Sequence, residues 1–328
     1  MKPKIYITRK IDDCVLKTLA NTYDVTMWPE EDVAVPREVL LREVKHVDAL
    51  FCLLTETIDE EVLDAALNLR VVSNMAVGFN NIDIEAATRK GIAVTNTPDV
   101  LTETTADLTF ALLMATARRI VESETFLKDG KWQTWSPMLL TGQDIHGATL
   151  GIIGLGRIGE SLVKRAKGFD MNVIYHSRTR KPVIEDKYDL TYTPLETLLE
   201  QSDFVVVLTP LTSETKNLIS YGQFALMKKS AILINTSRGG IVNEEALYDA
   251  LVEERIWGAG IDVFDQEPVS TEHPLLKLPN VVVTPHIGSA SIQTRLDMAH
   301  LAVKNIQDVL DGQPNDCIVN REYDAYLD

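Results

Sequence analysis

The sequence predicts an α/β protein with two doubly wound parallel-sheet domains, one of them inserted into the other. Three observations predict this class. Short runs of β-branched residues alternate with helical patterns along nearly the whole chain, as in a parallel sheet with crossover helices. A glycine-rich loop directly follows one of these runs near the middle of the chain. The length of 328 residues exceeds the usual size of one domain and falls short of three, so two domains are expected.

The first hundred residues carry the pattern of one sheet. Their near-continuous apolar runs indicate strands that are buried on both faces. The predicted strands cover 4–8, 47–54, 69–74 and 92–96, and the predicted helices lie near 12–19 and 60–66. At 102–121, a capping-type start, dense helix formers and basic residues toward the end predict one long connecting helix.

A second series of strands follows a tryptophan-containing loop. These strands are predicted at 149–154, 172–177, 204–209, 231–237, 258–264 and 280–286, enough for a complete doubly wound unit. Residues 291–312 have the pattern of one helix, and the tail after it is too short to build a domain of its own. The end of the chain therefore has to pack on the first sheet. The predicted domains are 1–100 with 287–328, and 101–286 between them.

Composition and charge limit the expected partners. Hydrophobic residues make up 45% and charged residues 24% of the chain, which is ordinary for a soluble globular protein. The formal net charge is −16, and an acidic surface repels nucleic acid and anionic membranes. Cys14, Cys52 and Cys317 lie far apart and suggest neither a disulfide framework nor a zinc site. Because no apolar segment is long enough for a signal peptide or a membrane span, we expect a cytoplasmic protein.

The glycine loop of the second series reads Gly154-Leu155-Gly156-Arg157-Ile158-Gly159. A strand precedes it and a helical pattern follows it, which is the context in which such a loop binds a dinucleotide. The first glycine permits a tight turn, the second lets the backbone approach the pyrophosphate, and the third allows close packing of helix on strand. The helix N-terminus then faces the negative charge. An ordinary turn with convenient glycines is the less favoured alternative.

The turn after the next strand indicates which dinucleotide is preferred. An acidic residue about 20 positions after the loop would bind the ribose 2′-hydroxyl of NAD, but Ser177 stands 21 positions after Gly156. The residues that follow it are Arg178, Thr179, Arg180 and Lys181. Guanidiniums and hydroxyls suit a 2′-phosphate, which an acid would repel. We therefore expect NADP(H) to be preferred, with NAD(H) as a possible second cofactor; a solvated basic turn is the alternative.

Three further motifs follow predicted strands, at the edge where open α/β sheets place their ligands. They are Asn235-Thr236-Ser237-Arg238-Gly239-Gly240, the run 260–268 that contains Glu267, and Thr284-Pro285-His286-Ile287-Gly288-Ser289. Reduction of a keto acid needs a hydride donor, a proton donor and a cation for the carboxylate. His286 can donate a proton near neutral pH, and Glu267 can orient its ring. Arg238 can hold the carboxylate and polarise the ketone.

Each of these residues also has a structural alternative. A lone arginine is more often a surface ion-pair partner, and Glu267 before a proline could be an exposed turn acid. His286 differs from the other histidines because it ends a predicted buried strand. A metal hydrolase is a minor alternative that would use His286, His273, Glu267 and Asp262. No HExxH-like cluster fixes such ligands, so no metal is expected.

Together with the glycine loop, these motifs resemble the D-isomer-specific 2-hydroxyacid dehydrogenase family over essentially the whole chain. Ser-Arg-Thr-Arg-Lys at 177–181 and Thr-Pro-His-Ile-Gly-Ser-Ala-Ser at 284–291 look most like its glyoxylate and hydroxypyruvate reductase branch. The resemblance implies a Rossmann-type cofactor domain inserted into a flavodoxin-like substrate domain. It also implies NADPH-dependent reduction of a small anionic 2-keto acid, glyoxylate or hydroxypyruvate, to the D-2-hydroxy acid, with Arg238, Glu267 and His286 as the catalytic residues.

The resemblance implies further contacts. Cofactor contacts are implied for Gly154, Leu155, Gly156, Arg157, Ile158, Gly159, Ser177, Arg178, Thr179, Arg180, Thr209, Pro210, Thr236, Ser237, Arg238, Asp262, His286 and Gly288. Asp262 would accept a hydrogen bond from the nicotinamide carboxamide, with a strand-end cap as its alternative role. The segment 74–83 resembles the substrate loop of the family. Backbone amides near Val77 and Gly78 would hold the substrate carboxylate together with Arg238, beside His286, and a plain turn is the alternative.

We expect a homodimer, and two functional alternatives stay open. Trp132 and Trp135 lie in the loop after the long helix, where members of the resembled family make subunit contacts, and that helix is richer in apolar residues than one subunit needs. The main alternative within the family is a 2-ketogluconate reductase, with phosphoglycerate, formate and phosphite less favoured as substrates. The alternative from another class is a binding protein that senses the dinucleotide without turnover.

Overall fold

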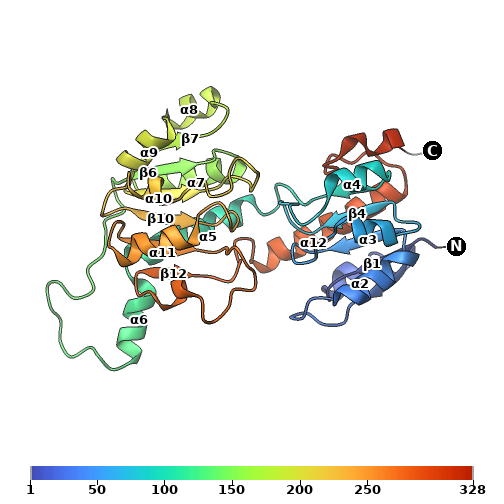
Figure 1. The fold of residues 1–328 in the computed structure, drawn as a ribbon, viewed down its shortest axis with the longest axis horizontal. Helices are drawn as coiled ribbons and strands as arrows, with labels where there is room; N and C mark the ends of the chain where they lie inside the picture. The colour runs from blue at the N-terminus through green and yellow to red at the C-terminus, as the bar shows by residue number, and fades with distance from the viewer. Residues whose placement is uncertain (1, 327–328) are drawn as a thin grey trace. The chain divides into compact units, whose positions relative to one another are not determined.

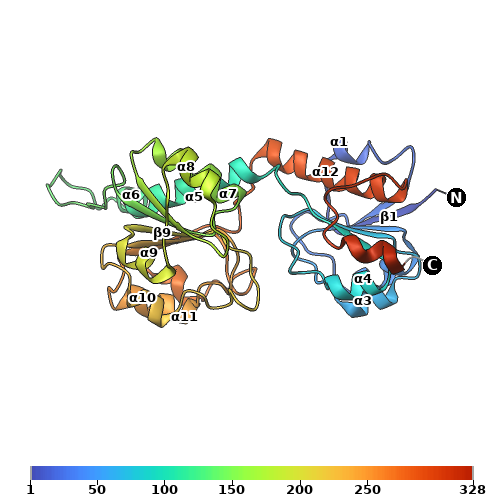
Figure 2. The same cartoon turned by 90° about the horizontal axis from the view of Figure 1, so that it is seen from above.

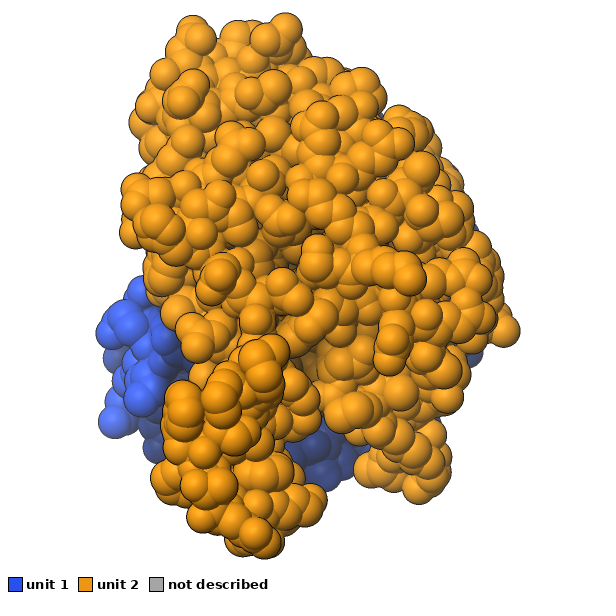
Figure 3. Space-filling model, turned by 90° about the vertical axis from the view of Figure 1, so that its left-hand side faces the viewer, with its two compact units in different colours: residues 1–101, 290–328 blue, residues 102–289 orange. Residues whose placement is uncertain are grey.

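The computed structural model describes residues 2–326 and contains two compact units. Unit 1 comprises Met1–Leu101 and Ala290–Asp328, and unit 2 comprises Thr102–Ser289. Figure 1 follows the chain by colour, and Figure 3 distinguishes the atoms of the two units. The middle of the chain therefore forms one unit, and both ends of the chain belong to the other. The assignment of cofactor and substrate roles to these units stays a prediction at this point.

Unit 1 contains a parallel five-stranded sheet in the order β2-β1-β3-β4-β5. The strands are β1 (Lys4–Ile7), β2 (Asp24–Met27), β3 (Ala49–Cys52), β4 (Val71–Asn74) and β5 (Ala93–Thr95). This is the strand order of flavodoxin-like sheets. The predicted flavodoxin-like class is confirmed by this sheet.

Helices cover both faces of this sheet. They are α1 (Asp13–Leu16), α2 (Arg37–Glu43), α3 (Glu60–Ala65), α4 (Ile84–Arg89) and α12 (Ile292–Leu310), with short 3-10 turns η1 (Val44–His46) and η3 (Arg321–Tyr326). Figure 2 shows α1 and α12 above the sheet and α3 and α4 below it. Alternate residues of each strand face opposite cores: Ile5 packs with α12, and Tyr6 packs on the other side. Burial on both faces explains the near-continuous apolar runs in the sequence.

Unit 2 contains a parallel seven-stranded sheet in the order β12-β11-β10-β9-β6-β7-β8. The strands are β6 (Thr149–Ile153), β7 (Asn172–His176), β8 (Thr191–Tyr192), β9 (Phe204–Val207), β10 (Ile232–Asn235), β11 (Gly258–Ile261) and β12 (Val281–Val283). Counted within the unit, the first strand lies between the second and the fourth, which is the Rossmann order. The strand order reverses between β6 and β9, so a ligand is expected at their carboxyl ends.

Unit 2 contains several helices, most of which pack in two layers, whereas α6 (Ile120–Lys128) has no buried residue. The others are α5 (Thr102–Ala117), α7 (Arg157–Lys167), α8 (Pro182–Tyr188), α9 (Leu195–Gln201), α10 (Tyr221–Phe224) and α11 (Glu244–Val252), with the 3-10 turn η2 (Pro274–Lys277). One core contains residues of α5 and α7, and the other contains residues of α9, α10 and α11. Figure 2 shows these two groups on opposite faces of the sheet.

The predicted helix at 102–121 is wrong in its extent. The structure ends α5 at Ala117 and begins α6 at Ile120. Arg119, between them, has a left-handed backbone with φ of 52°, which interrupts a right-handed helix. The amide of Gln143 donates to the carbonyl of Ala117 (2.9 Å) and satisfies an acceptor at the helix end. Helix propensity contains no information about this contact with a later segment.

The predicted helix at 291–312 is confirmed, because α12 covers Ile292–Leu310. Ser291 caps it, and its side chain accepts a hydrogen bond from the amide of Thr294. Among residues 2–326, no helix has both the length and the apolar character that a bilayer span requires.

Candidate active site

The glycine loop makes a tight turn after β6. Gly154 has φ of +100° and its amide donates to the carbonyl of His176 (2.8 Å). A Cβ at Gly154 would lie 2.9 Å from backbone atoms of the chain that follows β9, and one at Gly159 would lie 2.9 Å from the carbonyl oxygen of Gly154. By contrast, a Cβ at Gly156 would meet no heavy atom within 4 Å. The first and third glycines therefore allow close packing, whereas the second leaves open space beside the backbone.

This open space suits the pyrophosphate of a dinucleotide. Helix α7 begins directly after Gly156, and no side chain caps its first amides, so they can donate to an anion. At the neighbouring end of β9, the buried hydroxyl of Thr209 has no hydrogen-bond partner among the described residues. Uncapped amides, an unpartnered hydroxyl and open backbone space fit a phosphate-bearing cofactor. The individual cofactor contacts implied by the resemblance stay predictions.

Ser177 joins the turn after β7 to the glycine loop. Its hydroxyl accepts a hydrogen bond from the amide of Leu155 (2.8 Å). The side chain of Arg178 is 80% exposed and lies 3.8 Å from Glu214, a separation that leaves only a weak surface interaction. Ser177 and Arg178 are therefore placed beside the glycine loop, and the guanidinium of Arg178 is accessible.

The sequence suggested that Arg180 faces a 2′-phosphate, but in the structure its guanidinium binds a carboxylate of the helix that follows. Its Nε and Nη2 bind both carboxylate oxygens of Glu185 at 2.7–3.0 Å. The buried hydroxyl of Tyr175 also donates to Glu185 (2.5 Å) and accepts from the amide of Lys181 (2.7 Å). Hydrogen bonds from Arg180 and then from Tyr175 lower the pKa of Glu185 to about 2. Glu185 was not identified from the sequence, although its place in the first turn after a proline was visible.

His286 and Glu267 form the centre of the candidate active site. The Nδ1 of His286 lies 2.6 Å from Oε2 of Glu267, and the amide of Phe264 donates to Oε1 (2.9 Å). Both side chains are about three-quarters buried, with exposures of 23% and 25%. Burial raises the pKa of the Glu267 carboxyl. The hydrogen bond with His286 and the charges of His286 and Arg238 lower this pKa by more than burial raises it, so it lies below its ordinary value. Glu267 therefore stays ionised and holds one ring nitrogen, which leaves Nε2 for proton transfer.

The backbone at His286 is held in an uncommon conformation. Its φ is 52°, a left-handed value that costs free energy in a residue other than glycine. Asp262, after the end of β11, accepts hydrogen bonds from the hydroxyl of Thr284 (2.6 Å) and from the amides of Ile287 (2.8 Å) and Gly288 (2.9 Å). Burial raises the pKa of Asp262. These bonds correspond to the capping role considered for Asp262, and its contact with a cofactor stays a prediction.

Arg238 lies in the loop after β10, close to the loop that carries Glu267. The side chain of Asn235 donates to the carbonyl of Arg238 (3.1 Å), and Nη1 of Arg238 donates to the carbonyl of Ser237 (2.7 Å). Burial lowers the pKa of Arg238, and the charge of Glu267 opposes this shift. A Cβ at Gly239 would lie 2.0 Å from the carbonyl oxygen of Phe264. Only glycine allows the two loops to approach so closely.

The remaining predicted residues of unit 2 lie at the same edge of the sheet. Thr236 is buried, and its hydroxyl lies 2.7 Å from that of Thr109 on α5. The hydroxyl of Ser237 donates to the side chain of Asn235 (2.8 Å). The structure thus brings the glycine loop, the turn after β7, Arg238, Glu267 and His286 to the carboxyl edge of one sheet. A guanidinium, an imidazole with a fixed carboxylate and a dinucleotide loop are suited to reducing a carbonyl group.

In unit 1, Val77 and Gly78 lie in the turn after β4. Their carbonyl oxygens accept hydrogen bonds from Asn96 (2.8 Å) and Asn74 (2.9 Å). Asn74 belongs to the segment 74–83 that was predicted as the substrate loop, but no role was predicted for its side chain. Asn96 was missed in the sequence, although it ends a predicted strand. The role of the turn in substrate binding stays a prediction.

The residues of the metal alternative do not form one cluster. His286 contacts Glu267, whereas His273 lies 3.1 Å from Glu244. Among residues 2–326, no group of three or more His, Cys, Asp or Glu side chains is placed to hold a metal ion.

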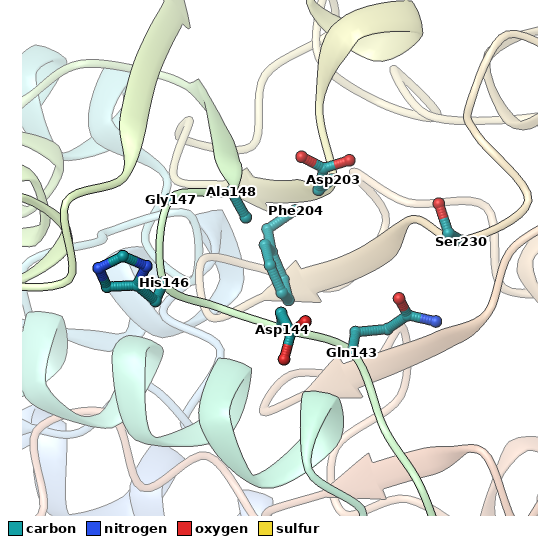
Figure 4. Close-up of a pocket in the computed structure, with 8 residues that line it drawn as sticks. All are labelled: Gln143, Asp144, His146, Gly147, Ala148, Asp203, Phe204 and Ser230. Carbon is teal, nitrogen blue, oxygen red and sulfur yellow. The ribbon is translucent and has the colours of Figure 1, made fainter.

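A cavity of about 280 Å³ lies elsewhere in unit 2. Asp144, His146, Asp203 and Phe204 are among its lining residues, and Figure 4 shows them around the Phe204 ring. These residues precede or begin β6 and β9, so the cavity lies at the amino edge of the sheet. None of the residues predicted to bind cofactor or substrate lines it.

Known proteins resemble the chain over nearly its full length. Residues 110–288 match the family described as D-isomer specific 2-hydroxyacid dehydrogenase, NAD binding domain. A glyoxylate reductase of Pyrococcus horikoshii is 52% identical over 326 residues, which cover 98% of this chain and 97% of that protein.

Two solved structures have a similar fold. A protein from Thermus thermophilus aligns with a TM-score of 0.90 at 44% identity, covering 96% of this chain and 99% of its own. An NADPH-dependent glyoxylate/hydroxypyruvate reductase from Sinorhizobium meliloti, in complex with NADP and malonate, aligns with a TM-score of 0.86 at 32% identity. That alignment covers 98% of each chain.

Proposed function

Because the chain belongs to the D-isomer specific 2-hydroxyacid dehydrogenase family and is an oxidoreductase, we propose that it is an NADPH-preferring reductase of glyoxylate and hydroxypyruvate. The products would be glycolate and D-glycerate. The observation that carries this proposal is the 2.6 Å contact between His286 and Glu267, at the same sheet edge as the glycine loop and Arg238. The high identity to glyoxylate reductases supports the choice of substrate.

In the proposed reaction, the bound cofactor supplies a hydride to the carbonyl carbon of the keto acid. His286 would supply a proton from Nε2 to the carbonyl oxygen, so that the π bond of the carbonyl is replaced by a C–H and an O–H bond while the C–O single bond remains. Arg238 holds the carboxylate of the substrate and stabilises the negative charge that develops on the oxygen. Glu267 fixes the ring through Nδ1 and balances the charge of the protonated imidazole. Water then returns a proton to His286.

The proposed cofactor preference depends on the turn after β7. No acidic side chain occupies position 177, and the hydroxyl of Ser177 lies beside the glycine loop. The exposed guanidinium of Arg178 can reach a 2′-phosphate, for which bidentate hydrogen bonding is favourable. Unit 2 would then be the NADP-binding domain. Unit 1 would be the substrate domain, with the amides near Val77 and Gly78 contributing to carboxylate binding.

The test is a set of steady-state assays with NADPH and three keto acids: glyoxylate, hydroxypyruvate and 2-ketogluconate. We expect glyoxylate or hydroxypyruvate to be reduced with the highest kcat/KM. If only 2-ketogluconate reacts, the proposed substrate is wrong while the chemistry stands. NADPH binding without turnover of any of the three would favour a binding protein instead.

A further inference from the structure

Three successive peptide groups of the turn after β4 have their carbonyl oxygens held by the rest of unit 1. The carbonyl of Ala76 accepts from the amide of Thr97 (2.9 Å). The carbonyl of Val77 accepts from the side-chain amide of Asn96 (2.8 Å), and the carbonyl of Gly78 accepts from that of Asn74 (2.9 Å). The three carbonyls therefore face donors that belong to unit 1 itself.

Peptide planarity decides where the amides of these groups point. In a trans peptide, the N–H and the C=O of one group point in opposite directions. The N–H groups of Val77, Gly78 and Phe79 are therefore turned away from the donors that hold the three carbonyls. Among the described residues, none of these three amides donates a hydrogen bond. Successive backbone amides in a turn can bind an anion, and such a surface is often called a nest.

The two asparagines are themselves fixed. Asn74 is completely buried and Asn96 is 9% exposed, so each side chain has little freedom to rotate. The backbone carbonyl of Asn96 accepts from the side chain of Asn305 on α12 (2.9 Å). Asn74 also donates to the side chain of Asn81 (3.3 Å), which in turn donates to the carbonyls of Leu53 (3.1 Å) and Glu56 (3.0 Å). The two asparagines that bind the turn after β4 are thus held in place by other residues of unit 1.

We propose that Asn96 and Asn74 are positioning residues that orient the amides of Val77, Gly78 and Phe79 toward the carboxylate of the substrate. This inference rests on the proposed function, because it takes a keto acid as the ligand. A carboxamide is suited to the task because it is a neutral donor. An ionised aspartate at either position could not donate to the backbone carbonyl oxygen, because a carboxylate only accepts hydrogen bonds. It would also place a negative charge close to the carboxylate of the substrate.

Asn96→Leu is the variant that tests the proposal, because it keeps a similar volume and removes the donor. Asn96→Ser, which is shorter and leaves room for water, is a second variant in case the first does not fold. Asn320→Leu is the matched control. Asn320 is another buried asparagine of unit 1, and it binds backbone groups of Ile92 and Val94 rather than the turn.

The measurement is the Kd of oxalate, determined by calorimetry on the full chain with and without NADP+, beside the Kd of NADPH. Oxalate presents a carboxylate and cannot accept a hydride. We expect the Asn96 variants to bind oxalate at least about tenfold more weakly, as for the loss of well-oriented hydrogen bonds to a charged group, with an unchanged Kd for NADPH. Asn320→Leu should change neither constant.

Oxalate binding by the Asn96 variants with the wild-type Kd would overturn the proposal, as would an equal loss of NADPH binding or the absence of oxalate binding in the wild type. Failure of the proposed function is a separate result. In that case the wild type binds oxalate, and Asn96→Leu weakens the binding, but glyoxylate is not reduced.

Discussion

Two arginines in one short turn differ in what they can bind. Arg180 binds Glu185 with its guanidinium, whereas Arg178 is exposed and lies 3.8 Å from the exposed carboxylate of Glu214. Arg178 is therefore the residue that we expect to contact a 2′-phosphate. Arg180 instead fixes the shape of the turn together with Tyr175 and Glu185.

Arg178→Gln should lower kcat/KM for NADPH at least about tenfold, because one charge-assisted contact to a phosphate is lost. Its kcat/KM for NADH should be unchanged, since NADH carries no 2′-phosphate. The comparison variant is Arg180→Gln, which should reduce the efficiency with both cofactors to a similar degree. Steady-state kinetics with each cofactor measure these effects. A selective loss of NADPH efficiency in Arg180→Gln, with Arg178→Gln unaffected, would reverse the assignment.

At the residue scale, the sequence predicted which side chains meet at the carboxyl edge of the sheet, because their positions depend on where strands end. Glu267 and His286 follow adjacent parallel strands, β11 and β12, so sheet topology alone brings their side chains to one edge. Glu185 and Asn96 could not be predicted in the same way. Each acts through a hydrogen bond to a residue whose position depends on how a turn folds back, and no periodicity in the sequence encodes that.

At the scale of elements, two carboxylates of α5, Glu103 and Asp107, bind side chains of α7, and Asp107 accepts from Nε of Arg165 (2.7 Å). Glu103 on α5 accepts hydrogen bonds from Ser161 (2.5 Å), Lys164 (3.2 Å) and Arg165 (2.9 Å) on α7. The hydrogen bond with Ser161, followed by that with Arg165, lowers the pKa of Glu103 from 4.5 to about 2. The carboxylate is therefore more acidic in the folded state than in the unfolded state.

Glu103→Gln should reduce the free energy of unfolding near neutral pH by up to about 1 kcal/mol, because the side chain is largely exposed and solvent screens its ion pairs. A depressed carboxyl pKa stabilises the fold above the unfolded value of 4.5, and this contribution disappears as the pH falls toward about 2. Urea unfolding between pH 7 and pH 2 measures the difference. Glu272→Gln, whose exposed carboxylate binds the exposed Lys277, is the control. A difference that grows as the pH falls would contradict this account.

Most strands of the two sheets could be predicted from the sequence, but the edge strands β2 and β8 were missed. Both are short and partly exposed, so they lack the apolar run that marks a buried strand. Helices α2 and α4 and the end of α5 were also not predicted. The strand pattern of β6 and the glycine loop depend on neighbouring residues alone, so β6 was predicted near its observed bounds and a helix was expected after the loop, where α7 lies. The end of α5, by contrast, depends on a residue that is distant in the sequence. It depends on the amide of Gln143, which approaches the carbonyl of Ala117 from a later part of the chain.

At the scale of the whole molecule, the surface of 114–139 is unusually apolar. Eight large apolar side chains are exposed there: Met114, Ile120, Val121, Leu127, Trp132, Trp135, Met138 and Leu139. Trp132 and Trp135 are 57% and 75% exposed. Large apolar surface that is exposed to water often marks a site of association. It supports the expected homodimer.

Light scattering at micromolar concentration should therefore give twice the mass of one chain. A variant with Trp132→Ser and Trp135→Ser should shift toward the monomer, because two large apolar side chains would no longer be removed from water. Val183→Ser, an exposed apolar residue on α8, is the matched control and should leave the dimer intact. A monomeric wild-type protein would contradict the expectation.

The central claim is that His286 donates the proton when a keto acid is reduced, and one variant tests it most directly. His286→Gln should lower kcat for glyoxylate reduction by about 10² to 10⁴, the usual contribution of a positioned acid, while the variant still binds NADPH. His300→Gln, an exposed histidine on α12, provides the control and should retain full activity. If His286→Gln keeps wild-type kcat in this assay, the proton comes from another group and the assignment of the active site is wrong.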